Sequence, residues 1–145
     1  MEQYDIIGAI KAYAESMKWH FIYGADSMLN YEAGNIDFAV GDLVLGATYV
    51  ARPSITNGRA TEIEYEMLMT LGRKVDADGT RADLDETLMQ KHEARLKELV
   101  QMLSNAIGQI ACNNELDVQN VRIEIRINQT DENIDMAYAT LTYIQ

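Results

Sequence analysis

The sequence predicts an α+β fold: a small antiparallel sheet packed against an amino-terminal helix and one long helix, with a protruding hairpin and a terminal β-hairpin. The first observation is residues 62–71, where apolar and polar side chains alternate with the period of two that marks a half-buried strand. Residues 121–127 show the same alternation. Between these segments, leucines and isoleucines recur at helical spacing from about residue 84 to 112, which predicts one long amphipathic helix.

Length and charge limit the classes of protein to consider. A chain of 145 residues is expected to fold as one α+β domain, residues 1–145, with a sizeable core. Twelve basic residues against 23 acidic ones give a formal charge of −11, which repels nucleic-acid phosphates and argues against a DNA-reading module. An acidic surface that faces passing DNA without gripping it is compatible with this charge. The single cysteine, Cys112, excludes an internal disulfide and favours a reducing compartment.

Neither export nor membrane insertion is expected. The first residues carry acidic side chains where a signal peptide would carry lysines. Apolar runs also stay well short of the roughly 18 residues that a membrane-spanning helix needs. We therefore expect no contact with a membrane.

The amino-terminal segment predicts a helix from Tyr4 to about Lys18, because apolar side chains recur there at helical spacing. These side chains are Ile6, Ile7, Ile10, Ala14 and Met17. The aromatic cluster at residues 19–23 is expected to anchor the end of this helix to the core. Residues 25–35 contain turn-forming pairs and predict a loop.

The middle of the chain predicts sheet and a protruding arm. Two short strands are expected at residues 36–40 and 43–50, with Gly46 marking a bulge or a close backbone approach. Residues 51–60 form a largely polar segment that contains Asn57-Gly58, a strong turn signal. We expect this segment to be an exposed hairpin arm.

The strand predicted at residues 62–71 has two different faces. Apolar side chains occupy one face, whereas Glu62, Glu64 and Glu66 share the other. Carboxylates roughly 7 Å apart along one strand make a poor cage for a cation. The acidic face is therefore expected to be solvated or to pair across the sheet with arginines of a later strand. Those arginines are Arg122 and Arg126.

The carboxyl-terminal half predicts the long helix and a final hairpin. Asp83 and Glu86 have the spacing of a capping box, and Asn113-Asn114 marks the helix end. The apolar stripe of this helix consists of Leu84, Leu88, Leu96, Leu99, Leu103, Ile107 and Ile110. Strands at residues 118–127 and 134–144 are expected to pair antiparallel. The last strand is apolar on both faces, so we expect both to be covered and its edge to need a partner.

Catalytic machinery is not recognisable in the sequence. His20 and His92 lack a second ligand at metal-binding spacing, and structural roles are expected for both. No serine has the context of a nucleophile elbow, and no glycine motif cradles a phosphate. We therefore predict no catalytic, cofactor-binding or metal-binding residue, and a protein that is not an enzyme.

The order of the elements resembles that of tail-terminator or tail-completion proteins of long-tailed bacteriophages, and of the related ring proteins of phage necks (head-tail connectors). The resemblance covers the amino-terminal helix, the segment TEIEYEMLMTLGRKV ahead of the long helix, and the ending VQNVRIEIRINQTDENIDMAYATLTYIQ. It implies a structural virion protein without cofactors, assembled in the host cytoplasm. It also implies a homo-oligomeric ring, commonly a hexamer in tail terminators and often twelve-fold in necks, stacked on other virion proteins around a DNA channel.

Two surfaces are the candidates for such a role. Glu62, Glu64 and Glu66, or the acidic loop at residues 76–83, are expected to face the channel, since a lining that repels phosphate lets DNA slide. The assembly arm is expected to consist of Arg52, Pro53, Ile55, Asn57, Gly58 and Arg59. Two alternatives stay open: a small cytoplasmic binding or adaptor module of unknown ligand, and, less favoured, an enzyme whose site is assembled from scattered residues.

Overall fold

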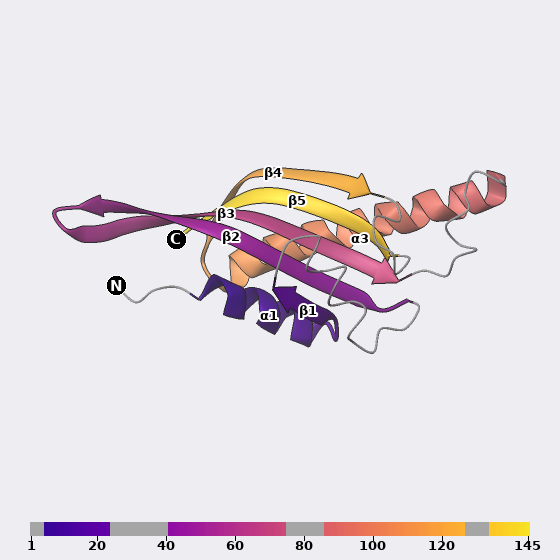
Figure 1. Cartoon of the computed structure of the whole chain (residues 1–145), viewed down its shortest axis with the longest axis horizontal. Coiled ribbons are helices and arrows are strands. Elements are labelled where there is room, and N and C mark those ends of the chain that lie inside the picture. The colour runs from indigo at the N-terminus through magenta and orange to yellow at the C-terminus, as the bar shows by residue number, and fades with distance from the viewer. Residues whose placement is uncertain (1–4, 24–40, 75–85, 127–133) are drawn as a thin grey trace.

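The computed structural model describes residues 5–23, 41–74, 86–126 and 134–145, and it confirms the α+β class (Figure 1). Two helices and five strands are present in these ranges. They are α1 (Ile6–Ser16), β1 (His20–Tyr23), β2 (Leu43–Thr56), β3 (Arg59–Lys74), α3 (Glu86–Asn113), β4 (Asp117–Arg126) and β5 (Ile134–Ile144). The strand predicted at 36–40, the loop predicted at 25–35 and the proposed cap residue Asp83 lie outside the described residues. The polar sequence at residues 72–81 predicts a surface loop, but this is wrong for residues 72–74, which continue β3 and pair with β5; residues 75–81 lie outside the described part of the structure.

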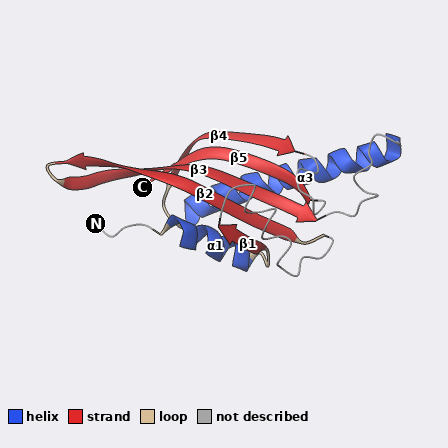
Figure 2. Cartoon of the chain, in the orientation of Figure 1, coloured by secondary structure: helices blue, strands red, loops and turns tan. Residues whose placement is uncertain are grey.

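The five strands form one mixed sheet in the order β1-β2-β3-β5-β4. β1 runs parallel to β2, and all other neighbours are antiparallel. The long helix α3 lies across one face of this sheet, as Figure 2 shows. The partners that the last strand was expected to need lie within the chain, because β5 pairs with β3 on one side and with β4 on the other.

α1 begins after Asp5, which caps it, and lies within the segment from Tyr4 to about Lys18 that the sequence predicts to be helical. The side chain of Asp5 accepts a hydrogen bond of 2.8 Å from the backbone N–H of Gly8, which satisfies one of the free donors of the first turn. Ile6, Ile10 and Ala14 are fully buried against the sheet. Met17 was expected on the same side, but it caps the carboxyl end of the helix and remains 45% exposed.

The aromatic segment after α1 is a strand, which the sequence did not predict. β1 pairs in register with the start of β2, with Phe21 beside Leu45 and Ile22 beside Gly46. A run of four residues is too short for a period of two to be recognised. Gly46 also pairs regularly, so the bulge predicted there is wrong; the observed irregularity lies between Ser54 and Ile55.

α3 is the main cover of the sheet. With 28 residues it is about 42 Å long at 1.5 Å per residue. The described part of its predicted stripe is buried, namely Leu96, Leu99, Leu103, Ile107 and Ile110. These side chains pack with the odd-numbered residues of β3 and β5 in the main hydrophobic core. The hydroxyl of Tyr143 in β5 also donates a hydrogen bond of 2.9 Å to the carbonyl of Ile107 and joins the two layers.

The opposite face of the sheet carries a second, smaller apolar cluster. It consists of Ile22, Val44, Met136 and Tyr138, with Leu68 packed beside them. Neither α1 nor α3 contributes a residue to this cluster. The expectation that β5 is apolar on both faces and that both are covered is thus confirmed for Met136 and Tyr138 on one side and Leu141 and Tyr143 on the other.

β4 forms an edge of the described sheet. Ile123 is partly buried against the core, whereas Val121 and Ile125 remain 46% and 44% exposed. Asn120 has a positive φ of 56°, and the pairing with β5 shifts register between Gln119 and Arg122. This bulge disturbs the free edge, a feature that discourages uncontrolled strand pairing. None of the described helices is long and apolar enough to cross a membrane.

Candidate functional site: the acidic face and the hairpin arm

β2 and β3 form one long hairpin that supports both candidate surfaces. Asn57 and Gly58 connect the strands with φ values of 53° and 75°, as a two-residue turn of type I′ requires. β5 pairs with β3 from Glu64 onward. Between the pair Pro53–Ile63 and the turn, the hairpin therefore consists of β2 and β3 alone, and no other described strand pairs with it. The hairpin therefore continues out of the sheet without a break and projects past α1 (Figure 1).

The predicted alternation along β3 is confirmed. Ile63 and Tyr65 are buried at 8% and 2% exposure, whereas Glu62, Glu64 and Glu66 are exposed on the other face. We call the surface formed by these three glutamates the acidic face. It lies on the side of the sheet opposite the main core. The role of this surface beside a DNA channel stays a prediction.

Arg52, on the neighbouring strand, partly neutralises the acidic face. Its guanidinium Nη1 donates to Oε2 of Glu66, and both side chains are more than half exposed. The pKa of Arg52 is raised, first by this hydrogen bond, then by attraction to Glu66 and more weakly to Glu64. Glu62 and Glu64 make no ion pair with any side chain that the structure describes.

The alternative pairing of the glutamates with arginines of a later strand is wrong. Arg122 and Arg126 belong to β4, and β5 lies between β4 and β3. Arg122 stands opposite Thr140 of β5 instead. Sequence reasoning assumed that the two alternating strands were neighbours, and it therefore overlooked Arg52, whose register partner is Glu64.

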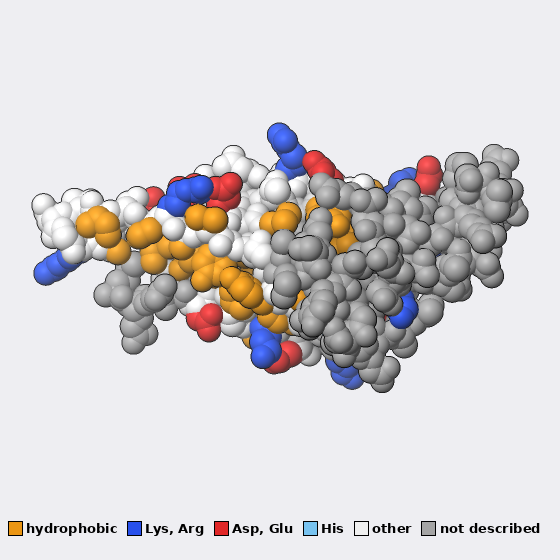
Figure 3. Space-filling model, in the orientation of Figure 1, with side chains coloured by type: hydrophobic (Ala, Val, Ile, Leu, Met, Phe, Trp, Pro, Cys, Tyr) orange, Lys and Arg blue, Asp and Glu red, His pale blue; other side chains and the backbone are white. Residues whose placement is uncertain are grey.

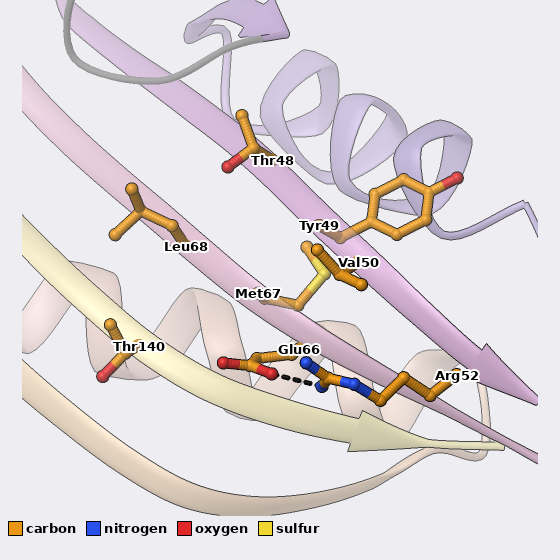
Figure 4. Close-up of a pocket in the computed structure, with 8 residues that line it drawn as sticks. All are labelled: Thr48, Tyr49, Val50, Arg52, Glu66, Met67, Leu68 and Thr140. Atoms are coloured by element: carbon orange, nitrogen blue, oxygen red, sulfur yellow. Dashed lines mark hydrogen bonds and ion pairs between the residues drawn. The ribbon is translucent and has the colours of Figure 1, made fainter.

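A shallow groove of about 460 Å³ lies where the arm meets the sheet (Figure 4). The Arg52–Glu66 pair marks one end of this groove, and Thr48 and Leu68 lie toward the other. Its lining consists of Thr48, Tyr49, Val50, Arg52, Glu66, Met67, Leu68 and Thr140. Apolar side chains beside three hydroxyl-bearing side chains and an ion pair suit binding of a small amphipathic group. Within the described residues, no cluster of His, Cys, Asp or Glu could hold a metal ion.

The six predicted arm residues all lie in the hairpin and are exposed. The structure adds a property that the sequence interpretation missed, because that interpretation considered the polar turn alone. Beyond the bulge, Ile55 pairs with Ala60, so these two side chains share a face with Ala51 and Pro53. We call these four residues the apolar arm face; Ile55 within it is 62% exposed. Hydrophobic side chains follow the arm as a line in Figure 3.

His20 contributes to the fold near the other end of β2. Its Nε2 lies 3.3 Å from Oδ2 of Asp42, so the pair links β1 to the residue before β2. Both side chains are partly exposed. The contact supports the structural role expected for His20, whereas the side chain of His92 lies outside the described part of the structure.

Comparison with known proteins adds no family to this picture. No protein-family model matches the chain, and no curated protein has a matching sequence.

Proposed function

We propose that this chain is a structural virion protein that forms a homo-oligomeric ring around the DNA passage of a bacteriophage tail end or neck, as a tail terminator or head-tail connector. The observation that carries the proposal is the hairpin of β2 and β3, which projects past α1 and exposes apolar side chains on a strongly charged chain. In this proposal the arm binds a neighbouring subunit or virion protein. The acidic face lies beside the DNA.

The arm supports assembly for an energetic reason. A two-stranded hairpin alone is marginally stable in water, and the arm has no third strand outside the pair Pro53–Ile63 among the described elements. Removal of exposed apolar side chains such as Ile55 from water by a partner lowers the free energy of the complex. A neighbouring protein would therefore both order and cover the arm.

The charge distribution supports a passage for DNA. Lysines or arginines in a channel would hold the phosphates and make release depend on salt. Glu62 and Glu64 form no ion pair among the described side chains, whereas Arg52 pairs with Glu66 and attracts Glu64 more weakly. An acidic lining of this kind would repel the duplex and let it slide.

Shortening the arm tests its role in assembly. A variant in which Asn-Gly replaces residues 54–62 keeps the pair Pro53–Ile63 and a turn of the same type. We expect this variant to fold, as judged by circular dichroism, and to lose assembly in analytical ultracentrifugation. The substitution Thr56→Ser is the matched control, because it leaves the apolar arm face intact. A shortened chain that unfolds, or that assembles as well as the parent, contradicts the assembly role.

A second candidate is a binding or adaptor module, which the groove beside the Arg52–Glu66 pair favours. This function predicts a stable monomer or dimer that captures a small amphipathic ligand in the groove. Leu68→Asp would then abolish capture without changing the oligomeric state. If the chain forms a ring and Leu68→Asp leaves its assembly unchanged, the virion role is favoured.

A further inference from the structure

The turn at the tip of the arm joins an asparagine to a glycine in a position that is open to water. Asn57 and Gly58 are both exposed, with φ values of 53° and 75°. A Cβ atom added to Gly58 would meet nothing within 4 Å. Glycine itself has no Cβ, so its backbone nitrogen is less shielded than that of any other residue type. The side-chain amide of Asn57 therefore lies next in the chain to an accessible backbone nitrogen.

The hydrogen bonds of the turn leave both groups free to react. Thr56 and Arg59 form the last pair of the hairpin, so the closing backbone bonds belong to these two residues. Among the described residues, the N–H of Gly58 and the amide of Asn57 have no hydrogen-bond partner. Neither group must break a hydrogen bond within the protein before it reacts.

The closed turn opposes a reaction between them, so the arm must open first. The turn holds Asn57 in the left-handed conformation, whereas a ring closed by the next nitrogen requires that nitrogen on the side-chain side of the Cα–C bond. No third described strand supports the arm beyond the pair Pro53–Ile63, and its register shifts after Ser54. A two-stranded hairpin of this kind is marginally stable in water and opens locally. The order of the arm therefore sets how often Asn57 can react.

We propose that Asn57 is a site of spontaneous covalent modification in the free chain. In the opened turn, the backbone nitrogen of Gly58 forms a bond to Cγ of Asn57 and loses its proton to solvent. The bond from Cγ to the side-chain nitrogen breaks, and this nitrogen takes up a proton from solvent and leaves as ammonia. Water then adds to one of the two carbonyl carbons of the resulting succinimide and opens the ring to aspartate or isoaspartate. The net reaction consumes one water, releases one ammonia and transfers no electrons.

Both products change the arm. The sequence holds no carboxylate between Asp42 and Glu62, so aspartate brings the first negative charge to this stretch, beside Arg59. Isoaspartate brings the same charge and also lengthens the backbone by one carbon atom, because the chain then runs through Cβ and Cγ. The turn fixes the register of a hairpin, so this extra atom should disturb the pairing of β2 with β3 in the arm.

The modification also bears on assembly, and this part rests on the proposed function, in which the arm binds a neighbour. A bound arm cannot open, so chains within a ring should keep Asn57 intact. Chains that carry isoaspartate should have a disturbed arm and be left out of the ring. The reaction would thus withdraw chains that stay unassembled.

Incubation of the purified chain in mildly alkaline buffer tests the site. The chain is first diluted until it sediments as a monomer. Peptide mass spectrometry should show that the peptide with Asn57 converts to aspartate and isoaspartate forms, while the solution gains ammonia. Asn120 is the internal control, because its φ of 56° matches that of Asn57 but Val121 follows it within β4. Asn120 should remain unchanged over the same time.

Two variants and one condition separate the chemistry from the structure. Asn57→Gly removes the amide and keeps the turn, since Gly-Gly also forms type I′, so the reaction at this site should be lost completely. Freshly prepared Asn57→Asp adds the charge without the extra backbone atom, and it should keep the parent's circular dichroism spectrum. The parent in urea should react faster than the native parent, because unfolding removes the protection that the turn gives.

The outcomes distinguish this inference from the proposed function. If Asn57 stays intact in the native monomer for a time in which the chain in urea reacts completely, the arm does not open and the site is wrong. Equal modification of Asn57 and Asn120 also overturns the site, because the reaction would not depend on the glycine turn. If Asn57 reacts as fast in the assembled chain as in the monomer, the site stands and the arm is not an assembly contact.

Discussion

The packing of α3 on the sheet gives the sharpest test of the fold, through the substitution Leu103→Ala. Leu103 is completely buried in the main core, in the middle of the apolar stripe of the helix. The helix itself should persist in the variant, because alanine is the best helix former. Any loss of stability therefore reports on the contacts between helix and sheet.

The expected loss has two parts. Removing the buried carbon atoms of leucine beyond Cβ costs about 2–3 kcal/mol of transfer free energy at about 0.8 kcal/mol for each methylene-sized group. The cavity left behind adds to this cost where the neighbouring side chains cannot collapse, so the total should lie between about 2 and 5 kcal/mol. Leu103 touches a core built from both strands and helix, which limits such relaxation.

Urea denaturation followed by circular dichroism measures this loss, at one fixed protein concentration because assembly also contributes to stability. Lys97→Ala is the matched control, since it makes the same change to alanine at an exposed position of the same helix. The control should change the free energy of unfolding by less than about 0.5 kcal/mol. An equally small change for Leu103→Ala would show that the buried face of α3 is misassigned.

Three further predictions concern the core, the response to pH and the acidic face. Tyr143→Phe should destabilise the chain by about 1 kcal/mol in urea, because the buried hydroxyl loses its hydrogen bond to the helix, whereas Tyr23→Phe at an exposed position should not. Burial raises the pKa of Tyr65 above its ordinary value of 10.0, so its contribution to stability is fully present below pH 10 and is lost as pH rises from there through the higher folded value; the free energy of unfolding should fall over this range. Replacing Glu62 and Glu64 by lysine should leave folding intact yet create DNA retention by the ring that falls steeply with salt in filter binding.

Each of these predictions has a control or a contrary result. Equal losses of unfolding free energy in Tyr143→Phe and Tyr23→Phe would contradict a stabilising hydrogen bond between β5 and α3. Tyr65→Phe should reduce the dependence of stability on pH above 10, and an unchanged slope would assign that dependence to other groups. Lysines at Glu93 and Glu98 on α3 make the same change in charge away from the acidic face. If DNA retention rises equally in this control, the acidic face does not lie beside the DNA as proposed.

Local sequence pattern predicted the long elements of the fold well. The period of two along β3 and the helical stripe from Leu96 to Ile110 each extend over several repeats, so side chains on the buried face could be named in advance. The turn at Asn57-Gly58 was equally clear, because few residue pairs tolerate two positive φ values.

Strand order could not be derived in the same way. Pairing between distant segments depends on the whole sheet. Because β5 lies between β3 and β4, the arginine that pairs with the acidic face is Arg52 of β2 and not Arg122 of β4. The apolar arm face was obscured for a related reason. A bulge after Ser54 changes which residues share a face, so Ile55 and Ala60 became neighbours only once the register was known.

Native mass spectrometry of the purified chain, combined with negative-stain electron microscopy, tests the central claim of ring assembly most directly. The account predicts a single species whose mass is one fixed whole-number multiple of 16.3 kDa, seen as closed rings with a central opening. The multiple should stay the same over a range of protein concentrations, because a closed ring has no free end to extend. A monomer of 16.3 kDa at every concentration would contradict the account.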